Sequence, residues 1–222
     1  MHVVVNAATS ADGKLSTRER RQVPISGPED FTRVDRLRAE NDAVMVGVGT
    51  VLADDPRLGL DDQELIAERE TRGDPPEPAR VVADSRARTP PDARVLDGSA
   101  RTYLLVSDAA PDERLAELER ETVRIVRAGR ERVDLRAALD ALEADGVRQV
   151  MVEGGGELLF SLFSLDLVDE LSLYLGSLVI GGREAPTLAD GEGFLSDSEF
   201  SDLTLRGVER VDDGVLLRYD VG

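Results

Sequence analysis

The chain has 222 residues, no cysteine, one histidine and a formal net charge of −18, from 45 acidic and 27 basic residues. These counts exclude disulfide bonds, thiolate catalysis and metal sites built from cysteine or several histidines, so no metal is expected. The acidic balance argues against nucleic-acid binding, and no apolar stretch is long enough to predict a membrane span or a signal peptide. A cytoplasmic protein without a membrane partner is therefore expected.

In chain order, the apolar spacing predicts strands that alternate with helices. The strands are predicted at residues 3–7, 42–48, 80–83, 102–106, 123–126 and 149–152, and the helices at 28–40, 111–121, 134–144 and 156–163. In the first helix, Phe31, Val34 and Leu37 would face the core. A polar, proline-containing surface excursion at 61–78, with a short helix at 62–70, interrupts the alternation.

The pattern changes towards the end of the chain. Further strands are predicted at residues 170–175, 203–208 and 214–219. The last two are joined through Asp212, Asp213 and Gly214 like an antiparallel hairpin. At this length, one domain covering residues 1–222 is the default. The predicted fold is therefore α/β, with a mixed, mainly parallel sheet and an antiparallel C-terminal hairpin.

The segment 45–58 (MVGVGTVLADDPRL) joins an apolar strand to a Gly-Val-Gly-Thr turn and then to two carboxylates. Gly47 and Gly49 would let the backbone approach a ligand, and Thr50 offers a hydroxyl and a backbone N–H. On this motif alone, a tight strand-to-helix turn followed by a solvated acidic loop is the better interpretation.

A second motif at 150–158 (VMVEGGGEL) runs a strand into Gly154, Gly155 and Gly156. Three consecutive glycines between core elements lose much conformational freedom on folding, which a close backbone approach to a pyrophosphate explains better than a flexible loop. Two glycine-rich strand ends suit an extended dinucleotide at the carboxyl ends of the strands. Neither motif has the G-x-G-x-x-G spacing, so a standard Rossmann domain is not indicated.

Polar residues after the strand at 80–83 suit a phosphate. A hydroxyl and a guanidinium from Ser85 and Arg86 match the 2′-phosphate that distinguishes NADPH from NADH. For Arg88, cofactor binding and a solvated surface position are equally good interpretations.

The sequence resembles the riboflavin-biosynthesis reductases, and among them the stand-alone archaeal type. The segments that carry the resemblance, in the family's order, are 6–15, 25–26, 36–58, 81–86, 151–159, 168–171, 180–187 and 212–221. The resemblance implies a dihydrofolate-reductase-like three-layer α/β/α fold, NADPH as hydride donor and a homodimer. It also implies reduction of 2,5-diamino-6-ribosylamino-4(3H)-pyrimidinone 5′-phosphate to the ribitylamino product. The apolar run at 171–180 (LSLYLGSLVI) also favours the homodimer.

The resemblance also implies which residues line the cofactor site. They are Gly47, Gly49, Thr50, Asp54, Ser85, Arg86, Gly154, Gly155, Gly156 and Glu157. In a chain with one histidine, a carboxyl group is the natural proton handler. We expect Asp54 near the nicotinamide and Glu153 near the substrate, both catalytic, whereas a helix-cap or turn role is at least as good for Asp55.

The 5′-phosphate of the substrate demands local positive charge in an acidic protein. The predicted substrate-binding residues are Asn6, Lys14, Ser26, Arg38 and Arg57. Lys14 is the sole lysine. The alternatives are a salt bridge from Lys14 to Asp12, a helix-end contact for Arg38, and a buried Asn6 amide that satisfies loop backbone.

Other interpretations stay open at this stage. The substrate of the alternative reaction is the deaminated 5-amino-6-ribosylamino-uracil phosphate, and dihydrofolate reductase is a weaker candidate. A non-catalytic NADPH-binding sensor and an acidic interaction protein come from other classes. The acid excess with one lysine resembles proteins of extreme halophiles, whereas a high-GC genome explains only the lysine deficit.

Overall fold

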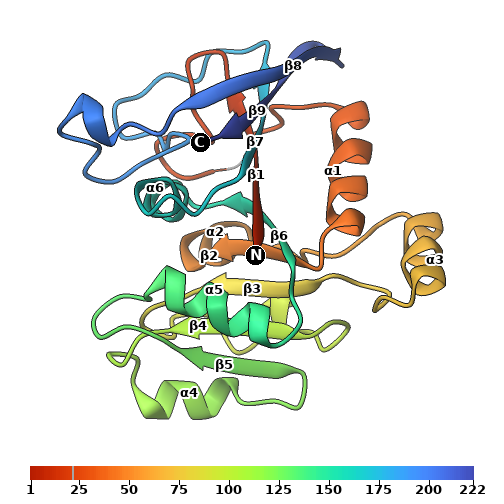
Figure 1. Cartoon of the computed structure of the whole chain (residues 1–222), viewed down its shortest axis with the longest axis vertical. Helices are drawn as coiled ribbons and strands as arrows, with labels where there is room; N and C mark the ends of the chain where they lie inside the picture. The colour runs from red at the N-terminus through yellow and green to blue at the C-terminus, as the bar shows by residue number, and fades with distance from the viewer. Residues whose placement is uncertain (22) are drawn as a thin grey trace. The chain divides into compact units, whose positions relative to one another are not determined.

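The structure is a computed structural model, and it describes residues 1–21 and 23–222 (Figure 1). The chain forms two compact units, the first from residue 1 and residues 35–151, the second from residues 2–34 and 152–222. The expected single domain over residues 1–222 stays a prediction. None of the helices in the described part of the chain is long and apolar enough to cross a membrane.

A parallel sheet forms the core of the first unit. Neighbouring strands pair in the order β5-β4-β3-β2, and every pair is parallel. The strands are β2 (Ala43–Gly47), β3 (Ala79–Ala83), β4 (Thr102–Val106) and β5 (Val123–Arg127). The helices are α2 (Val48–Asp54), α3 (Gln63–Arg72), η1 (Arg94–Leu96), α4 (Asp112–Leu118) and α5 (Leu135–Ala144). Val46, Val82 and Leu104 are buried in one cluster with apolar residues of α2 and α4, which holds these helices on the sheet.

The second unit carries the mixed part of the sheet. β1 (His2–Ser10) pairs parallel with β7 (Glu170–Gly176), and β9 (Gly214–Val221) pairs antiparallel with both β7 and β8 (Leu203–Val211). The helices α6 (Gly156–Ser164) and η2 (Asp197–Glu199) also belong to it. α1 (Pro28–Glu40) and β6 (Gln149–Gly154) each run from one unit into the other. The predicted mixed, mainly parallel sheet with an antiparallel C-terminal hairpin is therefore confirmed.

Helix α1 does not pack by the predicted apolar stripe. Phe31 is 59% exposed, and the other two predicted core residues are only half-buried. Instead, the carboxylate of Asp212, in the turn between β8 and β9, accepts the backbone N–H groups of Glu29 and Asp30 at 3.2 and 3.0 Å. This distant carboxylate satisfies the orphan donors of the first helical turn. Polar anchors thus place the start of α1, which apolar spacing does not reveal.

The excursion at 61–78 is more than a surface loop. Leu65 of α3 is buried against Ala39 and Leu60. Arg69 is 2% exposed, and its guanidinium donates to the backbone carbonyls of Ala39 and Asn41, both at 2.8 Å. These carbonyls lie at the end of α1 and just beyond it, where helical partners are missing. Most residues of the excursion are exposed, as predicted, but Leu65 and Arg69 are buried. The sequence does not reveal the burial of Arg69, because a buried arginine looks like a solvated one in sequence.

Candidate active site

The first glycine motif is the start of a helix. β2 ends at Gly47, which is the N-cap of α2 with φ −75° and ψ 151°, and no side chain caps this helix. Gly49 and Thr50 follow in the first turn, where Gly49 is exposed and Thr50 half-buried. A Cβ at Gly49 would meet no atom within 4 Å. The protein's own packing therefore does not require glycine at this position, and the first-turn N–H groups can donate to a ligand.

The two adjacent acids at the end of α2 differ in their contacts. Asp55 is the C-cap with φ 42° and ψ 57°, and its carboxylate accepts the backbone N–H of Arg94 at 2.8 Å. The cap role proposed for Asp55 is therefore present. Asp54 is exposed, and its carboxylate has no hydrogen bond or ion pair with any described residue. Partial desolvation raises the pKa of Asp54, so this carboxyl keeps a proton to higher pH than an ordinary aspartate.

The buried carboxylate of Asp84 holds the loop after β3 in place. This residue is fully buried, and its Oδ2 accepts the backbone N–H and the hydroxyl of Thr89 at 2.7 and 2.8 Å. Its Oδ1 has no partner within the described residues. Asp84 thus faces inward, and Ser85, Arg86 and Arg88 form the outer side of the loop, half-buried in the first case and exposed in the others.

Each outer residue of this loop has a different partner. Ser85 Oγ accepts the backbone N–H of Val133 at 3.1 Å, which leaves the hydroxyl proton for another contact. Arg86 pairs with Glu131 at 2.8 Å. The guanidinium of Arg88 has no hydrogen bond or ion pair with residues 1–21 or 23–222.

Arg38 and Arg57 contact neighbouring residues of one segment. Arg38 donates to the carbonyl of Gly59 at 3.0 Å, and Arg57 donates to the carbonyl of Leu60. Arg57 also pairs with Glu77 at 3.0 Å, and a Cβ at Gly59 would lie 2.7 Å from the Glu77 carboxylate. The structure thus brings the two predicted phosphate-binding arginines together, but a phosphate on Arg57 would compete with Glu77.

In the second unit, the glycines after β6 have separate structural reasons. Gly155 is the N-cap of α6 and has φ 100°, a backbone conformation that favours glycine. A Cβ at Gly156 would lie 2.7 Å from the carbonyl of Thr187 and 2.9 Å from the carboxylate of Asp190. The backbone of Asp190 also donates to Gly156 at 3.1 Å. The close approach at Gly156 is therefore to the chain's own segment 187–190.

This difference between glycines gives a test. Gly156→Ala should lower the free energy of unfolding by about 1–3 kcal/mol, because the backbone must shift. Gly49→Ala should raise it slightly, by less than about 1 kcal/mol, because alanine favours the helix. Urea unfolding followed by circular dichroism checks both values. Equal stability of the two variants would contradict the assigned packing, and any loss of nucleotide affinity in Gly49→Ala would report a ligand at α2.

The remaining predicted residues of this motif flank the glycines. Glu153 is half-buried near the end of β6, and Gly154, the last residue of that strand, is buried. Glu157 is exposed in the first turn of α6. The structure thus places one carboxylate on each side of the triple glycine.

Lys14 lies against the segment 180–187. Its backbone N–H donates to Ser10 Oγ at 2.9 Å, and its Nζ donates to the carbonyl of Ala185 at 3.2 Å. Hydrogen bonds from the Ser10 hydroxyl and the Ile180 N–H lower the pKa of Asp12 to about 2. No Lys14–Asp12 ion pair is present in the described part of the chain, so that alternative is wrong. Ser26, also half-buried, has no hydrogen bond there.

Asn6 lies in the middle of β1, not at its end as predicted. It is 7% exposed, and its Oδ1 accepts from Arg33 of α1 at 2.9 Å. Arg33 also donates to Ser172 of β7 at 2.9 Å and pairs with the buried Asp30 at 2.7 Å. Because a guanidinium only donates, the amide oxygen faces Arg33 and the amide nitrogen remains for other contacts. Sequence reasoning missed Arg33, since a helix-surface arginine carries no signal of burial.

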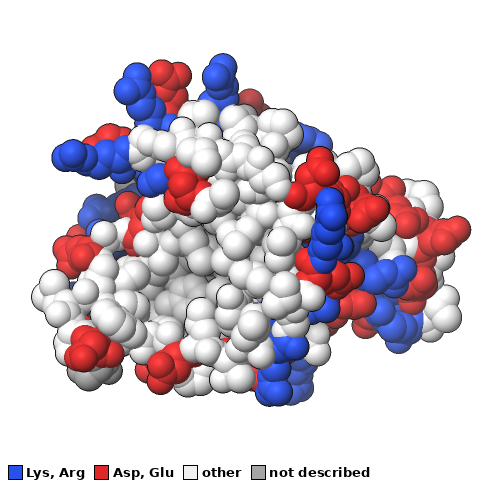
Figure 2. Space-filling model, turned by 90° about the horizontal axis from the view of Figure 1, so that it is seen from above, with Lys and Arg blue, Asp and Glu red and all other residues white. Residues whose placement is uncertain are grey.

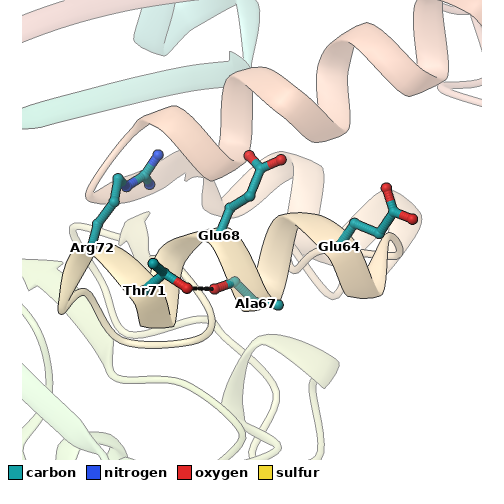
Figure 3. A pocket seen from close by; sticks show the side chains of 5 residues that line it. All are labelled: Glu64, Ala67, Glu68, Thr71 and Arg72. Atoms are coloured by element: carbon teal, nitrogen blue, oxygen red, sulfur yellow. Dashed lines mark hydrogen bonds between the residues drawn. The ribbon is translucent and has the colours of Figure 1, made fainter.

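The hollow in Figure 3 is separate from these residues. It is an open depression along α3. Its lining residues are Glu64, Ala67, Glu68, Thr71 and Arg72. Because no predicted site residue lines it and its walls are mostly surface side chains, we assign it no catalytic role.

Comparison with known proteins places the chain in a family. A family model described as the RibD C-terminal domain matches residues 1–217, and the chain belongs to this family. A protein of Archaeoglobus fulgidus is 49% identical over 213 residues, which cover 96% of this chain and 94% of that protein. A protein of Methanothermobacter thermautotrophicus is 43% identical over 220 residues, covering 99% and 98%. Both are named 2,5-diamino-6-ribosylamino-4(3H)-pyrimidinone 5′-phosphate reductase.

A solved structure supports the fold. The pyrimidine reductase-like protein of Corynebacterium diphtheriae matches with a TM-score of 0.83, covering 99% of this chain and 91% of that one, at 21% identity. The predicted dihydrofolate-reductase-like fold is confirmed by such neighbours.

Proposed function

We propose that the protein is an NADPH-dependent reductase of riboflavin biosynthesis that converts 2,5-diamino-6-ribosylamino-4(3H)-pyrimidinone 5′-phosphate to its ribitylamino product. The observation that carries the proposal is the 49% identity, over nearly the whole length, to a protein that bears this reductase name. The deaminated uracil phosphate is the second candidate substrate. A cytoplasmic location, expected from the sequence, stays a prediction.

The reaction requires a hydride, which NADPH would supply, and one proton. Asp54 is the proposed acid, because its raised pKa favours a carboxyl that holds a proton and its oxygens make no hydrogen bond to described residues. It would protonate the ring oxygen of the ribosyl group as the bond from that oxygen to C1′ breaks, while the nitrogen lone pair forms the iminium. Glu153 is proposed to stabilise the positive iminium carbon that accepts the hydride. The ribosyl phosphate would be bound by Lys14, Ser26, Arg38 and Arg57, with Asn6 donating to the pyrimidinone or ribose.

NADPH is proposed over NADH because of the loop after β3. In many NAD sites a carboxylate after a strand accepts the ribose hydroxyls. Here the carboxylate of Asp84 faces inward and is bonded to Thr89, which removes that option. Ser85 and Arg86 instead offer a hydroxyl and a guanidinium to a 2′-phosphate. The backbone around Gly47, Gly49 and Thr50 and around Gly154, Gly155, Gly156 and Glu157 is proposed to contact the rest of the cofactor.

A homodimer is proposed from the face of the second unit's sheet. Val208 of β8 lies opposite Leu217 of β9, which lies opposite Leu173 of β7, so these apolar side chains share one face. Leu205 and Val208 are 53% and 62% exposed. Figure 2 shows a broad uncharged expanse with charged side chains at its margins. We propose that the sheet face with Val208, Leu217 and Leu173 packs against the same face of a second copy, which avoids contact between charged surfaces in a chain of net charge −18.

Val208→Asp should convert the dimer to a monomer. A carboxylate on this face would be buried without a partner, which should raise the dimer dissociation constant at least about a hundredfold. Thr204→Asp is the matched control, because Thr204 is exposed on the opposite face of β8. Light scattering in 2 M KCl measures the mass. A monomeric wild type, or equal masses for both variants, would rule out this interface.

The proposed reaction is tested by NADPH absorbance in concentrated KCl. The diamino ribosylamino phosphate, its deaminated analogue and dihydrofolate are offered separately. Turnover with the first is expected, and turnover with only the second would assign the alternative substrate. Saturable NADPH binding without any turnover would favour a nucleotide sensor, and no binding at all would favour an interaction protein.

A further inference from the structure

Two loops of the first unit gather exposed arginines around one acidic residue. Arg86 and Arg88 lie in the loop after β3, and Arg130 and Arg132 flank Glu131 in the loop after β5. All five side chains are exposed. Within the described residues, the only hydrogen bond or ion pair of these five side chains joins Arg86 to Glu131, at 2.8 Å. A protein with a net charge of −18 thus carries excess positive charge on these two short segments.

The backbone holds the two loops side by side without help from this ion pair. Ser107, buried just after β4, donates its hydroxyl to the carbonyl of Ser85 at 2.7 Å and lies 3.2 Å from the carbonyl of Glu131. Ser85 Oγ accepts the backbone N–H of Val133 at 3.1 Å. Removal of the Glu131 carboxylate should therefore leave the loop positions intact. The ion pair needs an explanation other than loop structure.

We propose that Glu131 is a specificity-determining residue, because its carboxylate occupies the Arg86 guanidinium that would bind the 2′-phosphate of NADPH. This inference rests on the proposed function. Carboxylate and phosphate compete for the same guanidinium donors, and a phosphate also repels a neighbouring carboxylate. The side chains of Arg86 and Glu131 are 54% and 81% exposed, so the pair is weak enough for a ligand to displace. NADH lacks the 2′-phosphate and does not meet this competition.

Glu131→Gln should tighten NADPH binding and leave NADH binding unchanged. An exposed ion pair contributes at most about 1 kcal/mol, so the dissociation constant of NADPH should fall about two- to fivefold. The gain should shrink between 0.1 M and 2 M KCl, because salt screens exposed charges. Fluorescence titration of both reduced nucleotides against the full-length protein measures these constants. Thermal unfolding of the variant should match the wild type.

Two further variants separate local competition from net charge. Glu119→Gln makes the same change in charge, but Glu119 precedes β5 and Glu131 follows it. Glu119 therefore lies at the amino end of this strand, away from Glu131 at the carboxyl end. Glu119→Gln should leave the NADPH to NADH affinity ratio unchanged. In an Arg86→Gln background, Glu131→Gln should lose most of its effect, since the guanidinium contested by carboxylate and phosphate is gone.

The outcomes distinguish this inference from the function on which it rests. Wild-type binding of NADPH with an unchanged affinity ratio in Glu131→Gln would overturn the inference alone. Weaker NADPH binding in that variant would also overturn it, because Glu131 would then support Arg86 rather than compete for it. Failure of the wild type to bind either nucleotide would remove the proposed function and the inference together.

Discussion

Asp54→Asn is expected to lower kcat about 100- to 10,000-fold while the dissociation constant of NADPH changes little. The asparagine keeps the shape of the side chain and removes the proton that reduction of the substrate requires. Because no described residue bonds to the Asp54 carboxylate, the loss should not disturb the fold. Single-turnover oxidation of NADPH separates the chemical step from product release, and a fall of less than tenfold would remove Asp54 as the acid.

The pH dependence gives this prediction a direction. The pKa of Asp54 is raised above the ordinary value of 3.8 by desolvation, so the protonated form persists to higher pH. A reaction that uses this proton should be fastest below the raised pKa and slow down as the pH rises through it. Asp54→Asn should lose that part of the profile.

Asp55→Asn is the matched control for Asp54→Asn, since it changes the adjacent acid. Asp55 caps α2 and accepts the N–H of Arg94, so its replacement should affect stability, by about 1 kcal/mol, more than the pH profile.

The strands could be predicted because their signal is local. Runs such as Val44 to Val46, and the Asp-Asp-Gly turn at 212–214, determine strand and hairpin from neighbouring residues alone. The packing of α1 could not be predicted in the same way. Asp30 and Arg33 are fixed by Asp212 and Asn6, which are distant in sequence, and apolar periodicity contains no information about such polar partners.

In the candidate site too, local sequence indicates which residues are candidates but does not reveal their contacts. Residue type and position after a strand identified Ser85 and Arg86 as candidates, and the family resemblance and the need for a proton handler identified Asp54. The exposed surface of the first unit carries Arg86 and Asp54. The structural role of an individual residue depends on contacts with residues that are distant in sequence. A Cβ at Gly156 would lie too close to Thr187 and Asp190. The sequence motif suggested only a close approach to a pyrophosphate and gave no sign of these two residues.

Arg80→Met is expected to lower the free energy of unfolding by about 1–3 kcal/mol, the cost of leaving the acceptors around a buried guanidinium without their donor. Arg80 of β3 is fully buried, and its guanidinium donates to Asp97 and to the hydroxyl of Ser99, both at 2.6 Å, and to the carbonyl of Val95 at 3.3 Å. Methionine fills a similar volume but leaves these acceptors without their donor. Urea unfolding by circular dichroism measures the loss, and a change below about 1 kcal/mol would contradict it.

The acid limb of the stability curve tests the same contact from the side of Asp97. Burial alone would raise the pKa of Asp97, but hydrogen bonds from Arg80 and Ser99 hold it at about 2. A folded pKa below the unfolded value of 3.8 adds stability above that value, and the contribution is lost as the pH falls towards 2. In Arg80→Met, the free energy of unfolding should change less with pH in this range. Asp97→Asn should have the same effect with a smaller loss at neutral pH, because the Asp97 side chain is 37% exposed and water replaces part of its role.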